Sequence, residues 1–532
     1  MAQKTRQREG LTRSPRKSLE RTLLALSLLA ALPQAVAFAA LPSDIPLQWP
    51  LPYTRSAQTT PLRARLDAMR VSRPAPAGST PQTRIVTNCA DDDSAGSLRT
   101  LVDLSNSGDT IDLSKLSCST ISLSQGALKI ALDDLTLRGP GANQLTLDGG
   151  NRDRIILDPT SGTLTLQGLT IANGRFDAVD NDIGFGGCVA TGATLLLRDS
   201  VIRDCLAVGV GSYGGGVLSG FLIMTNSTIT GSTAFGDHPT NGTAAYGGGA
   251  FAYGVDIFDS TISGNSAIGT DNAPLSHFEI AGGLFIARNG GSIERSTISD
   301  NFAIRFAGGL TQEGDLELRN STISGNSTEQ DDGGGLRVRQ VTSVLIENTT
   351  ITGNHAGSSG GGISFIDNAL PSTLISTIVA ANSADASGAD IESAMRLRIS
   401  GSNNLIAAPG TNPILPADTL NVDPELLPLA NNGGPTRTHA LAETSPAIDH
   451  GTNPEGRGTD QRGYGYVRES NGVADIGAYE FQAEQSDPVA LPGPGLAASI
   501  TLTGLLALFG LRRRRIAAAS SRDSAQAANP LT

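Results

Sequence analysis

The chain contains few aromatic and few charged residues for its length. Aromatic residues make up 4% of its 532 residues and charged residues 17%, against about 25% charged residues in an average soluble protein. Glycine, by contrast, occurs 63 times. Helices packed through large aromatic side chains are therefore disfavoured, and short, closely stacked strands of small residues are favoured.

An excess of positive charge is also absent. The formal net charge is -12, and residues 1–37 hold seven Lys/Arg against two Asp/Glu, five positive charges in excess, so the rest of the chain carries -17. Leaving out the four arginines at 512–515 as well brings the body to about -21. An acidic body excludes nucleic acid as the expected partner, because phosphate binding depends on Lys and Arg. It is compatible with divalent cations or with solubility alone.

The first 39 residues are typical of a secretion signal. A basic stretch precedes the apolar run Leu23–Leu32, and small residues then offer a cleavage site at Ala37 or Ala39. An uncleaved anchor is the alternative, but ten apolar residues are too few to span about 30 Å of hydrocarbon. We therefore expect export, which permits disulfides among the four cysteines. Residues 40–84, rich in Pro, Thr, Ala and Arg, are interpreted as a flexible linker.

The C-terminal end combines a short motif, an apolar run and a basic cluster. The motif LPGPG at 491–495 leads into an uncharged run at 495–511, which the arginines at 512–515 follow directly. The run has the length of the shortest membrane spans, about 17 residues, and the arginines are expected on the cytoplasmic side. A buried core helix is the alternative, but such a helix does not end in four consecutive arginines.

This arrangement resembles the PEP-CTERM class of bacterial C-terminal sorting signals, although LPGPG differs from the standard motif. The resemblance implies a transmembrane helix over 495–511 and a basic cytoplasmic tail over 512–532. It also implies a sorting protease as a partner, so that the body is either anchored in the cell envelope or released after processing.

An internal repeat is the strongest signal in the sequence. Segments such as NSTITGS, DSTISGN and NTTITGN recur around one isoleucine at intervals of 25 to 36 residues. These isoleucines are Ile171, Ile202, Ile229, Ile262, Ile298, Ile323, Ile351 and Ile378. Aliphatic residues stand seven and five positions earlier in nearly every copy, and this period of two places both on one side of a strand.

Two or three glycines before an apolar residue follow each isoleucine, as in Gly333 to Leu336. Glycine supplies the backbone angles of a sharp corner. Each repeat is then one coil with three strands and three corners. The coils must stack, because one coil alone buries too little apolar surface to offset its backbone entropy. The sequence thus predicts an all-β fold, a right-handed parallel β-helix over residues 85–400.

Asparagines occupy one fixed position in four successive coils, three residues after the isoleucine. They are Asn265, Asn301, Asn326 and Asn354. Stacked at the strand spacing of about 4.8 Å, each side-chain amide is able to donate to the carbonyl of the next. We predict an internal asparagine ladder at a corner; solvent-exposed turn asparagines are the alternative.

The same alignment brings two cysteines together. Cys205 holds the asparagine position in its coil and Cys188 the position of the third glycine in the coil before, so both flank one corner within disulfide reach. Cys89 and Cys118 bracket the start of the stack. Between them, residues 97–106 have apolar side chains at helical spacing, which predicts a short helical cap over the first coil.

The pairing of ISGN-type turns with turns of the form GGG-aliphatic is similar to the repeats of polymorphic outer membrane proteins, which are built on a pectate-lyase-like β-helix. The resemblance covers roughly residues 85–400 and implies the same fold. This chain has isoleucine where that family favours phenylalanine.

Residues 401–482 resemble the choice-of-anchor Q domain, which follows such helices in exported bacterial proteins. The matching text includes NGGPT at 432–436, SPAID at 445–449 and DIGAYE at 475–480. The resemblance implies a position before an anchor, with residues 483–494 as a linker, and it implies no reaction. Polar residues in the match are expected to tie its turns together: Asp449, Asp460, Arg462, Asp475 and Glu480.

Catalysis by a polysaccharide lyase would need carboxylates that hold a cation on the substrate and an outward Arg or Lys as base. The outward column four residues before the isoleucines places Arg319 between Glu294 and Glu347, with Asp315 and Glu317 nearby. A charge ladder on a sheet face explains this column without chemistry. We therefore predict no catalytic residue.

Calcium is the one metal for which the sequence contains a candidate binding site. Asp177, Asp180 and Asp182 lie in one loop and carry oxygen ligands, but the spacing of an EF-hand is missing, and a solvated loop is the alternative. No other cofactor is expected. The histidines are scattered and show no zinc pairing: His238, His277, His355, His439 and His450.

Two classes of function remain. The first is an exported, non-enzymatic module at the cell envelope that presents a long polar face to a polysaccharide, a matrix or another cell-surface ligand. The second is a polysaccharide lyase or glycoside hydrolase on the same scaffold, which fold analogy alone supports. We favour the first.

Overall fold

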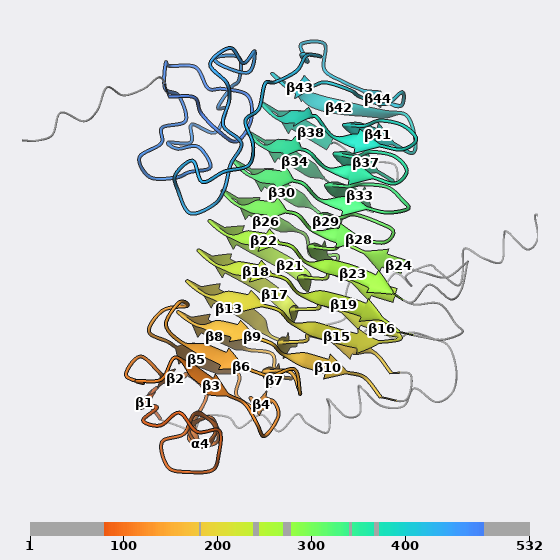
Figure 1. Cartoon of the computed structure of the whole chain (residues 1–532). Coiled ribbons are helices and arrows are strands. Elements are labelled where there is room, and N and C mark those ends of the chain that lie inside the picture. Colours follow the sequence, from red (N-terminus) through yellow and green to blue (C-terminus); the bar gives the residue numbers. More distant parts are fainter. Residues whose placement is uncertain are drawn as a thin grey trace, which may run out of the picture.

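The computed structural model describes residues 79–179, 182–237, 244–269, 278–339, 343–366 and 372–482. They form one long right-handed parallel β-helix, against whose side an irregular C-terminal segment (residues 421–482) is packed (Figure 1). The predicted all-β class and parallel β-helix are confirmed. The predicted signal peptide and the predicted membrane helix at 495–511 lie outside the described residues. Within the described ranges, no helix has the length and apolar content of a membrane span.

The strands belong to four sheets. Sheet A contains β1 (Thr83–Ile85), β2 (Asp109–Asp112), β4 (Leu128–Lys129), β5 (Asp134–Arg138), β7 (Ile156–Asp158), β8 (Thr163–Gln167), β12 (Val189–Thr191), β13 (Thr194–Arg198), β17 (Val217–Thr225), β21 (Ala250–Phe258), β25 (Leu284–Ile286), β26 (Gly291–Glu294), β29 (Leu310–Glu313), β30 (Leu316–Arg319), β33 (Leu336–Arg339), β34 (Val344–Glu347), β37 (Ile363–Phe365), β38 (Ser372–Ile375), β41 (Ile391–Ser393), β42 (Leu397–Ser402) and β44 (Pro413–Ile414). Sheet B contains β3 (Thr120–Ser122), β6 (Thr146–Asp148), β9 (Thr170–Ala172), β14 (Val201–Arg203), β18 (Thr228–Thr230), β22 (Thr261–Ser263), β27 (Thr297–Ser299), β31 (Thr322–Ser324), β35 (Thr350–Thr352), β39 (Ile378–Ala380) and β43 (Leu405–Ile406).

The other two sheets are shorter. Sheet C contains β10 (Arg175–Asp177), β15 (Leu206–Gly209), β19 (Thr233–Gly236), β23 (Ser266–Gly269), β28 (Phe302–Ala303), β32 (Ser327–Thr328), β36 (His355–Ala356) and β40 (Ser383–Ala384). Sheet D contains β11 (Gly184–Phe185), β16 (Gly211–Tyr213), β20 (Ala244–Tyr246) and β24 (Phe278–Ile280).

Each coil in the middle of the stack has three main faces, in sheets A, B and C. In some coils the strand of sheet A is continuous, as in β21, and in others a bend divides it, as at Gly290 between β25 and β26, where the backbone has a φ of 71°. The prediction of three strands per coil is therefore correct for the number of main faces. It did not include the division of the sheet A strand or the additional strands of sheet D.

The predicted isoleucines from Ile171 to Ile351 pair with one another from coil to coil. The last assignment is wrong by one residue, because the partner of Ile351 is Val379, whereas Ile378 pairs with Thr350 in the neighbouring column. Side chains of the true column are buried inside the helix with the other aliphatic columns. Ile378 belongs instead to an apolar cluster that includes Leu441 of the C-terminal segment.

The four predicted asparagines form one hydrogen-bonded column inside the helix. From Asn265 to Asn354, each Nδ2 donates to the Oδ1 of the next asparagine over 2.9 to 3.0 Å. Each Nδ2 also donates to a backbone carbonyl of the preceding coil, and each Oδ1 after the first accepts the backbone N–H of the asparagine before it. The side chains are buried, so the structure contains the ladder and excludes the solvent-exposed alternative.

The column is longer than predicted. Asn382 accepts a hydrogen bond from Asn354 over 2.9 Å and donates one of the same length to Asp390. The ladder position lies three residues after the core residue of each coil. Because the alignment used Ile378 in place of the true core residue Val379, Asn382 was not assigned to the ladder. Asp390 ends the column, since a carboxylate accepts hydrogen bonds and has none to pass on.

In the coils that contain the ladder, the last glycine of the pair or triplet faces an asparagine of the column. These glycines are Gly249, Gly283, Gly309, Gly335 and Gly362. A Cβ built on Gly309 would lie 2.9 Å from Cγ of Asn326, and one on Gly335 would lie 3.0 Å from Cγ of Asn354. Any larger residue would displace the amide, so the glycine and the asparagine are required together.

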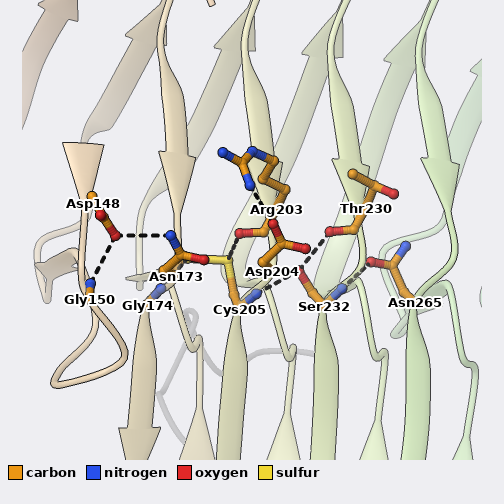
Figure 2. Close-up of a disulfide and its surroundings, with 11 residues drawn as sticks. Asp148, Gly150, Asn173, Gly174, Arg203, Asp204, Cys205, Thr230, Ser232 and Asn265 are labelled. Carbon is orange, nitrogen blue, oxygen red and sulfur yellow. Dashed lines mark hydrogen bonds and ion pairs between the residues drawn. A yellow bond between two sulfur atoms is a disulfide. The ribbon is translucent and has the colours of Figure 1, made fainter. Parts of the chain in front are cut away.

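A disulfide replaces this glycine–asparagine pair in an earlier coil. Cys188 and Cys205 are bonded, with 5.5 Å between their Cα atoms, as the alignment predicted. Figure 2 shows Cys205 in line with Ser232 and Asn265 of the following coils; the Ser232 backbone donates to the Asn265 amide over 3.0 Å. A second disulfide joins Cys89 and Cys118 at the start of the stack.

A serine column at the corner between sheets A and B was missed. The backbone N–H of Ser200 donates to the hydroxyl of Ser227, and this contact repeats through Ser260 and Ser296 to Ser321 over 3.1 to 3.2 Å. Each of these hydroxyls donates to the backbone carbonyl two residues earlier. The serine of the repeated NSTI text is therefore a structural residue.

The ends of the helix differ slightly from the prediction. Helix α4 (Leu98–Leu104) covers the first coil with Leu98 and Val102 buried, as expected. Strand β1 already pairs with β2, so the stack begins at Thr83, inside the predicted linker. At the other end the stack continues beyond residue 400 to β44.

The ladder yields a first testable prediction. We expect Asn326→Ala to lower the free energy of unfolding by about 3 kcal/mol or more, because it leaves buried donors of Asn301 without an acceptor. Denaturant unfolding followed by circular dichroism measures this. The control is Asn143→Ala, an exposed turn residue, with an expected change within about 0.5 kcal/mol. Equal effects of the two substitutions would contradict the ladder's role.

The disulfide yields a second prediction. The pair Cys188→Ala and Cys205→Ala should cost about 3 kcal/mol, the value for a closed loop of this size. The pair Cys188→Gly and Cys205→Asn should restore part of that loss, because it copies the pair found in later coils. Thermal unfolding under non-reducing conditions compares the two; an equal or lower stability of the glycine–asparagine variant would refute the equivalence.

Candidate functional site

The calcium hypothesis receives no support from the described part of the loop. Asp177 forms an ion pair of 2.8 Å with Arg175, and the Asp182 carboxylate accepts the backbone N–H of Ile183. Asp180 lies outside the described residues. No group of three or more metal-ligating side chains occurs in the described ranges.

The predicted charge column is in register, but its ion pairs differ from the prediction. Arg319 lies between Glu294 and Glu347 in the sheet. It is within 3.4 Å of Glu347 and also pairs with Glu317. Glu294 pairs instead with Arg457 of the C-terminal segment, over 2.9 Å. Sequence neighbourhood alone could not reveal a partner so far away in the chain.

The charge column therefore holds the C-terminal segment against the helix. Glu455 of this segment lies 3.6 Å from Arg319. Burial, reinforced by the charge of Glu455, raises the pKa of Glu347. The side chain of Glu347 is almost fully buried, so this carboxylate is out of reach of a polymer substrate, whereas Glu317 is about half exposed. The column is an internal contact of the protein.

The outer face of sheet B carries two columns of hydroxyl side chains. They flank the buried isoleucine of each TIT or TIS strand, so that one threonine and one serine or threonine per coil face outward. In β27, β31 and β35 these hydroxyls are buried beneath the C-terminal segment. The segment thus lies along several coils, as Figure 1 shows beside β30, β34 and β38.

The C-terminal segment docks by hydrogen bonds to these hydroxyls. Thr297 donates to the backbone carbonyl of Arg437 over 2.7 Å, and Thr322 donates to the Gln461 amide over 2.6 Å. Further contacts join the segment to Ser324, Thr350 and Ser376. The region that resembles an anchor domain is accordingly part of the helix surface and not a separate body.

The columns continue beyond the segment onto β18 and β22. There Thr228, Thr230, Thr261 and Ser263 are partly exposed, and the Ser263 hydroxyl donates to Thr230 over 3.3 Å. The same chemistry that holds the segment is thus available to solvent on these two strands.

Polar residues of the C-terminal segment form a buried network. Arg462 binds Asp460 through Nε and Nη2, over 2.9 and 2.6 Å. The Arg462 guanidinium lies between the rings of Tyr466 and Tyr479, 4.1 and 3.8 Å from their centroids. Glu480 accepts two backbone N–H groups, including that of Asp475 over 2.9 Å. Asp460, Arg462, Asp475 and Glu480 are buried and tie the turns together, as expected. Asp449, the fifth residue of that prediction, is exposed, and its backbone N–H donates to the Asp475 carboxylate over 2.8 Å.

The histidines remain apart from one another in the described ranges. His439 bridges Ser324 and the Leu427 carbonyl, and burial lowers its pKa. His355 contacts Ser383, and His450 contacts the Ile448 carbonyl. His238 and His277 lie outside the described residues.

A second apolar cluster outside the helix was missed by sequence reasoning. Aromatic rings of sheets A and D stack between the two sheets, with Tyr213 and Tyr246 4.9 Å apart and Phe251 and Phe285 5.1 Å apart. The guanidinium of Arg154 closes one end, 3.6 Å from the ring of Phe176, and burial lowers its pKa to about 9. The cluster is closed and structural.

A shallow groove of about 530 Å³ lies on the outer face of sheet C. Leu206, Val208, Phe235 and Ile268 form its floor, and polar residues such as Asp204 and Asp237 lie along it. The groove is open to solvent, so a ligand has access to it.

Comparison with known proteins adds little to this picture. No family model and no curated protein matches the chain. Among solved structures, the chain is similar to pectate lyase Pel9A, with a TM-score of 0.41 and 11% sequence identity over 76% of this chain and 97% of that chain. The fold therefore rests on the strand pairing described above.

The buried network of the C-terminal segment yields a prediction on pH. Burial raises the pKa of Glu480 to about 7, above its ordinary value, so the folded form keeps its proton to higher pH than the unfolded form. The stability that this group contributes is therefore complete below about pH 4.5 and is lost as the pH rises through about 7. Hydrogen-exchange protection of residues 421–482, corrected for the intrinsic rate, should be higher at pH 5 than at pH 8.

Glu480→Gln should flatten this dependence, while Glu443→Gln, at an exposed position of the same segment, should leave it unchanged. A slope that persists in Glu480→Gln would assign the effect to another group.

Proposed function

We propose that the protein is an exported β-helix surface protein, held at the cell envelope, that binds a polysaccharide or matrix ligand without transforming it. One observation carries the proposal: the hydroxyl columns of sheet B are exposed on β18 and β22, while the charge column around Arg319 is occupied in holding the C-terminal segment. The hydroxyls of β18 and β22 are able to donate and accept hydrogen bonds with a ligand.

Export and anchoring are the finer part of the proposal. Two disulfides support export, because such bonds persist in oxidising compartments. Four sequence features also support a location at the cell envelope. They are the signal-like N-terminus, the repeats similar to those of polymorphic outer membrane proteins, the choice-of-anchor Q-like segment and the PEP-CTERM-like end. In this reading, residues 495–511 hold the protein in a membrane until a sorting protease releases it.

The test separates binding from cleavage. The full chain, purified in detergent because of its apolar C-terminal run, is exposed to a panel of neutral and acidic polysaccharides with calcium present. We expect retention on at least one of them without new reducing ends and without the ultraviolet absorbance of unsaturated uronates.

Arg319→Ala serves as the discriminating variant. Because Arg319 contacts Glu455 of the C-terminal segment, this variant should weaken protection of residues 421–482, and neither the wild type nor the variant should release product. Release of product by the wild type, abolished in Arg319→Ala, would refute the proposal and establish a lyase or hydrolase.

A further inference from the structure

Tyr464 is the most exposed of the large apolar side chains in the described ranges. Its relative exposure is 102%, and it is the one aromatic residue among the exposed large apolar side chains in the described ranges. A fully exposed aromatic ring is available to pack against a ligand, and its phenolic hydroxyl is available for a hydrogen bond.

The ring stands on a rigid support. Residues 460–466 form a hairpin tip, closed by hydrogen bonds from the Tyr466 backbone to Gly463 and from the Asp460 backbone to Tyr466. Gly463 and Gly465 on either side of Tyr464 have φ values of 79° and 95°. The Arg462 guanidinium, bound to Asp460 and stacked on Tyr466, locks the base of the tip. The tyrosine is therefore held out in solvent at little further entropic cost on binding.

The tip lies at the edge of the uncovered hydroxyl columns. Gly463 is next to Arg295, whose Nε is 3.9 Å from a Cβ built on that glycine. Arg295 in turn binds Asp259 with both Nε and Nη2 over 2.8 Å, and Asp259 directly precedes the corner into β22. The hairpin tip that carries Tyr464 thus lies beside the corner that leads into β27, one coil from the exposed hydroxyls of β22.

We infer that Tyr464 and the hydroxyl columns of β18 and β22 form one binding face for a neutral, extended polysaccharide. This inference deepens the proposed function and rests on it. Sugar rings present C–H faces that pack on an aromatic ring and hydroxyls that both donate and accept. Threonine and serine hydroxyls also both donate and accept, and the coils repeat them at the strand spacing of about 4.8 Å.

The chain itself shows how this face is bound. On β27 and β31 the same columns receive the C-terminal segment through hydrogen bonds of Thr297 and Thr322. The uncovered strands continue that established interface without a break in register. A ligand on β18 and β22 would therefore lie in line with the segment, with Tyr464 at the junction.

The charges around this face favour a neutral polysaccharide over an acidic one. The charged groups beside the exposed columns are already paired: Asp259 with Arg295 and Asp204 with Arg203. Asp199 accepts a hydrogen bond from Asn226 over 2.7 Å. No excess of positive charge is left at this face to attract uronates, and the net charge of the whole chain is -12.

The experiment measures binding by biolayer interferometry with the immobilised full chain in detergent. The probes are hydroxyethylcellulose and dextran, both neutral, and polygalacturonate as the acidic comparator. Tyr464→Ala should weaken binding of a neutral probe by about tenfold or more, and Tyr464→Phe, which keeps the ring, should stay within about threefold. Thr261→Val should weaken it by about threefold to tenfold through loss of one hydroxyl.

Two variants serve as controls. Thr120→Val makes the same change in the same column at an exposed position on β3, far from Tyr464, and should leave binding unchanged. Phe235→Ala alters the groove of sheet C and should also leave it unchanged. Unfolding midpoints equal to that of the wild type show that each variant is folded.

The outcomes divide cleanly. The inference is supported if a neutral probe binds the wild type and if, of these variants, Tyr464→Ala and Thr261→Val alone weaken that binding by the stated factors. If binding of a neutral probe survives both substitutions, or if Phe235→Ala abolishes it, the ligand does not bind at Tyr464 and the hydroxyl columns. The inference is then wrong, but the proposed function still holds. Binding of polygalacturonate alone overturns the neutral ligand class. Absence of binding to every probe, extended to the full panel, overturns the inference and the proposed function together.

Discussion

Direct stacking of equivalent residues from coil to coil is the constraint on which the rest of the structure depends. Parallel strand pairing holds each side chain above its counterpart, so a polar group inside the helix has to find its partner in the adjacent coil. Asparagine meets this condition because one amide both donates and accepts. A carboxylate only accepts, and Asp390 accordingly stands where the column ends.

The same constraint explains why glycine and asparagine occur as a pair. The ladder amide fills the space in which the Cβ of the opposite residue would lie, so glycine there is a matter of room as well as of backbone angle. Cysteines occupy the two positions in one coil and fill the same space with a covalent bond. A glycine–asparagine pair and a disulfide thus fill the same space at this corner of the helix.

How much the sequence predicted follows from this regularity. Features that repeat with the coil, such as the isoleucine column, the asparagine ladder and the Cys188–Cys205 bond, were accessible because one alignment fixes them all. The alignment failed at Ile378, where two adjacent apolar residues competed for one position, and Asn382 was lost with it. Features that do not repeat were not predicted. The pairing of Glu294 with Arg457 and the docking of the C-terminal segment depend on contacts between residues more than a hundred positions apart in the sequence.

The position of the C-terminal segment limits how such a protein can change in length. A solenoid normally tolerates the gain or loss of a whole coil, because each coil contacts only its neighbours. Here the segment contacts Thr297 on β27, Thr322 on β31 and Thr350 on β35 at once. An added or lost coil between these strands would move at least one of these contacts out of reach. Evolutionary duplication of coils is therefore compatible with the half before β22, whereas the half under the segment is fixed at its present number.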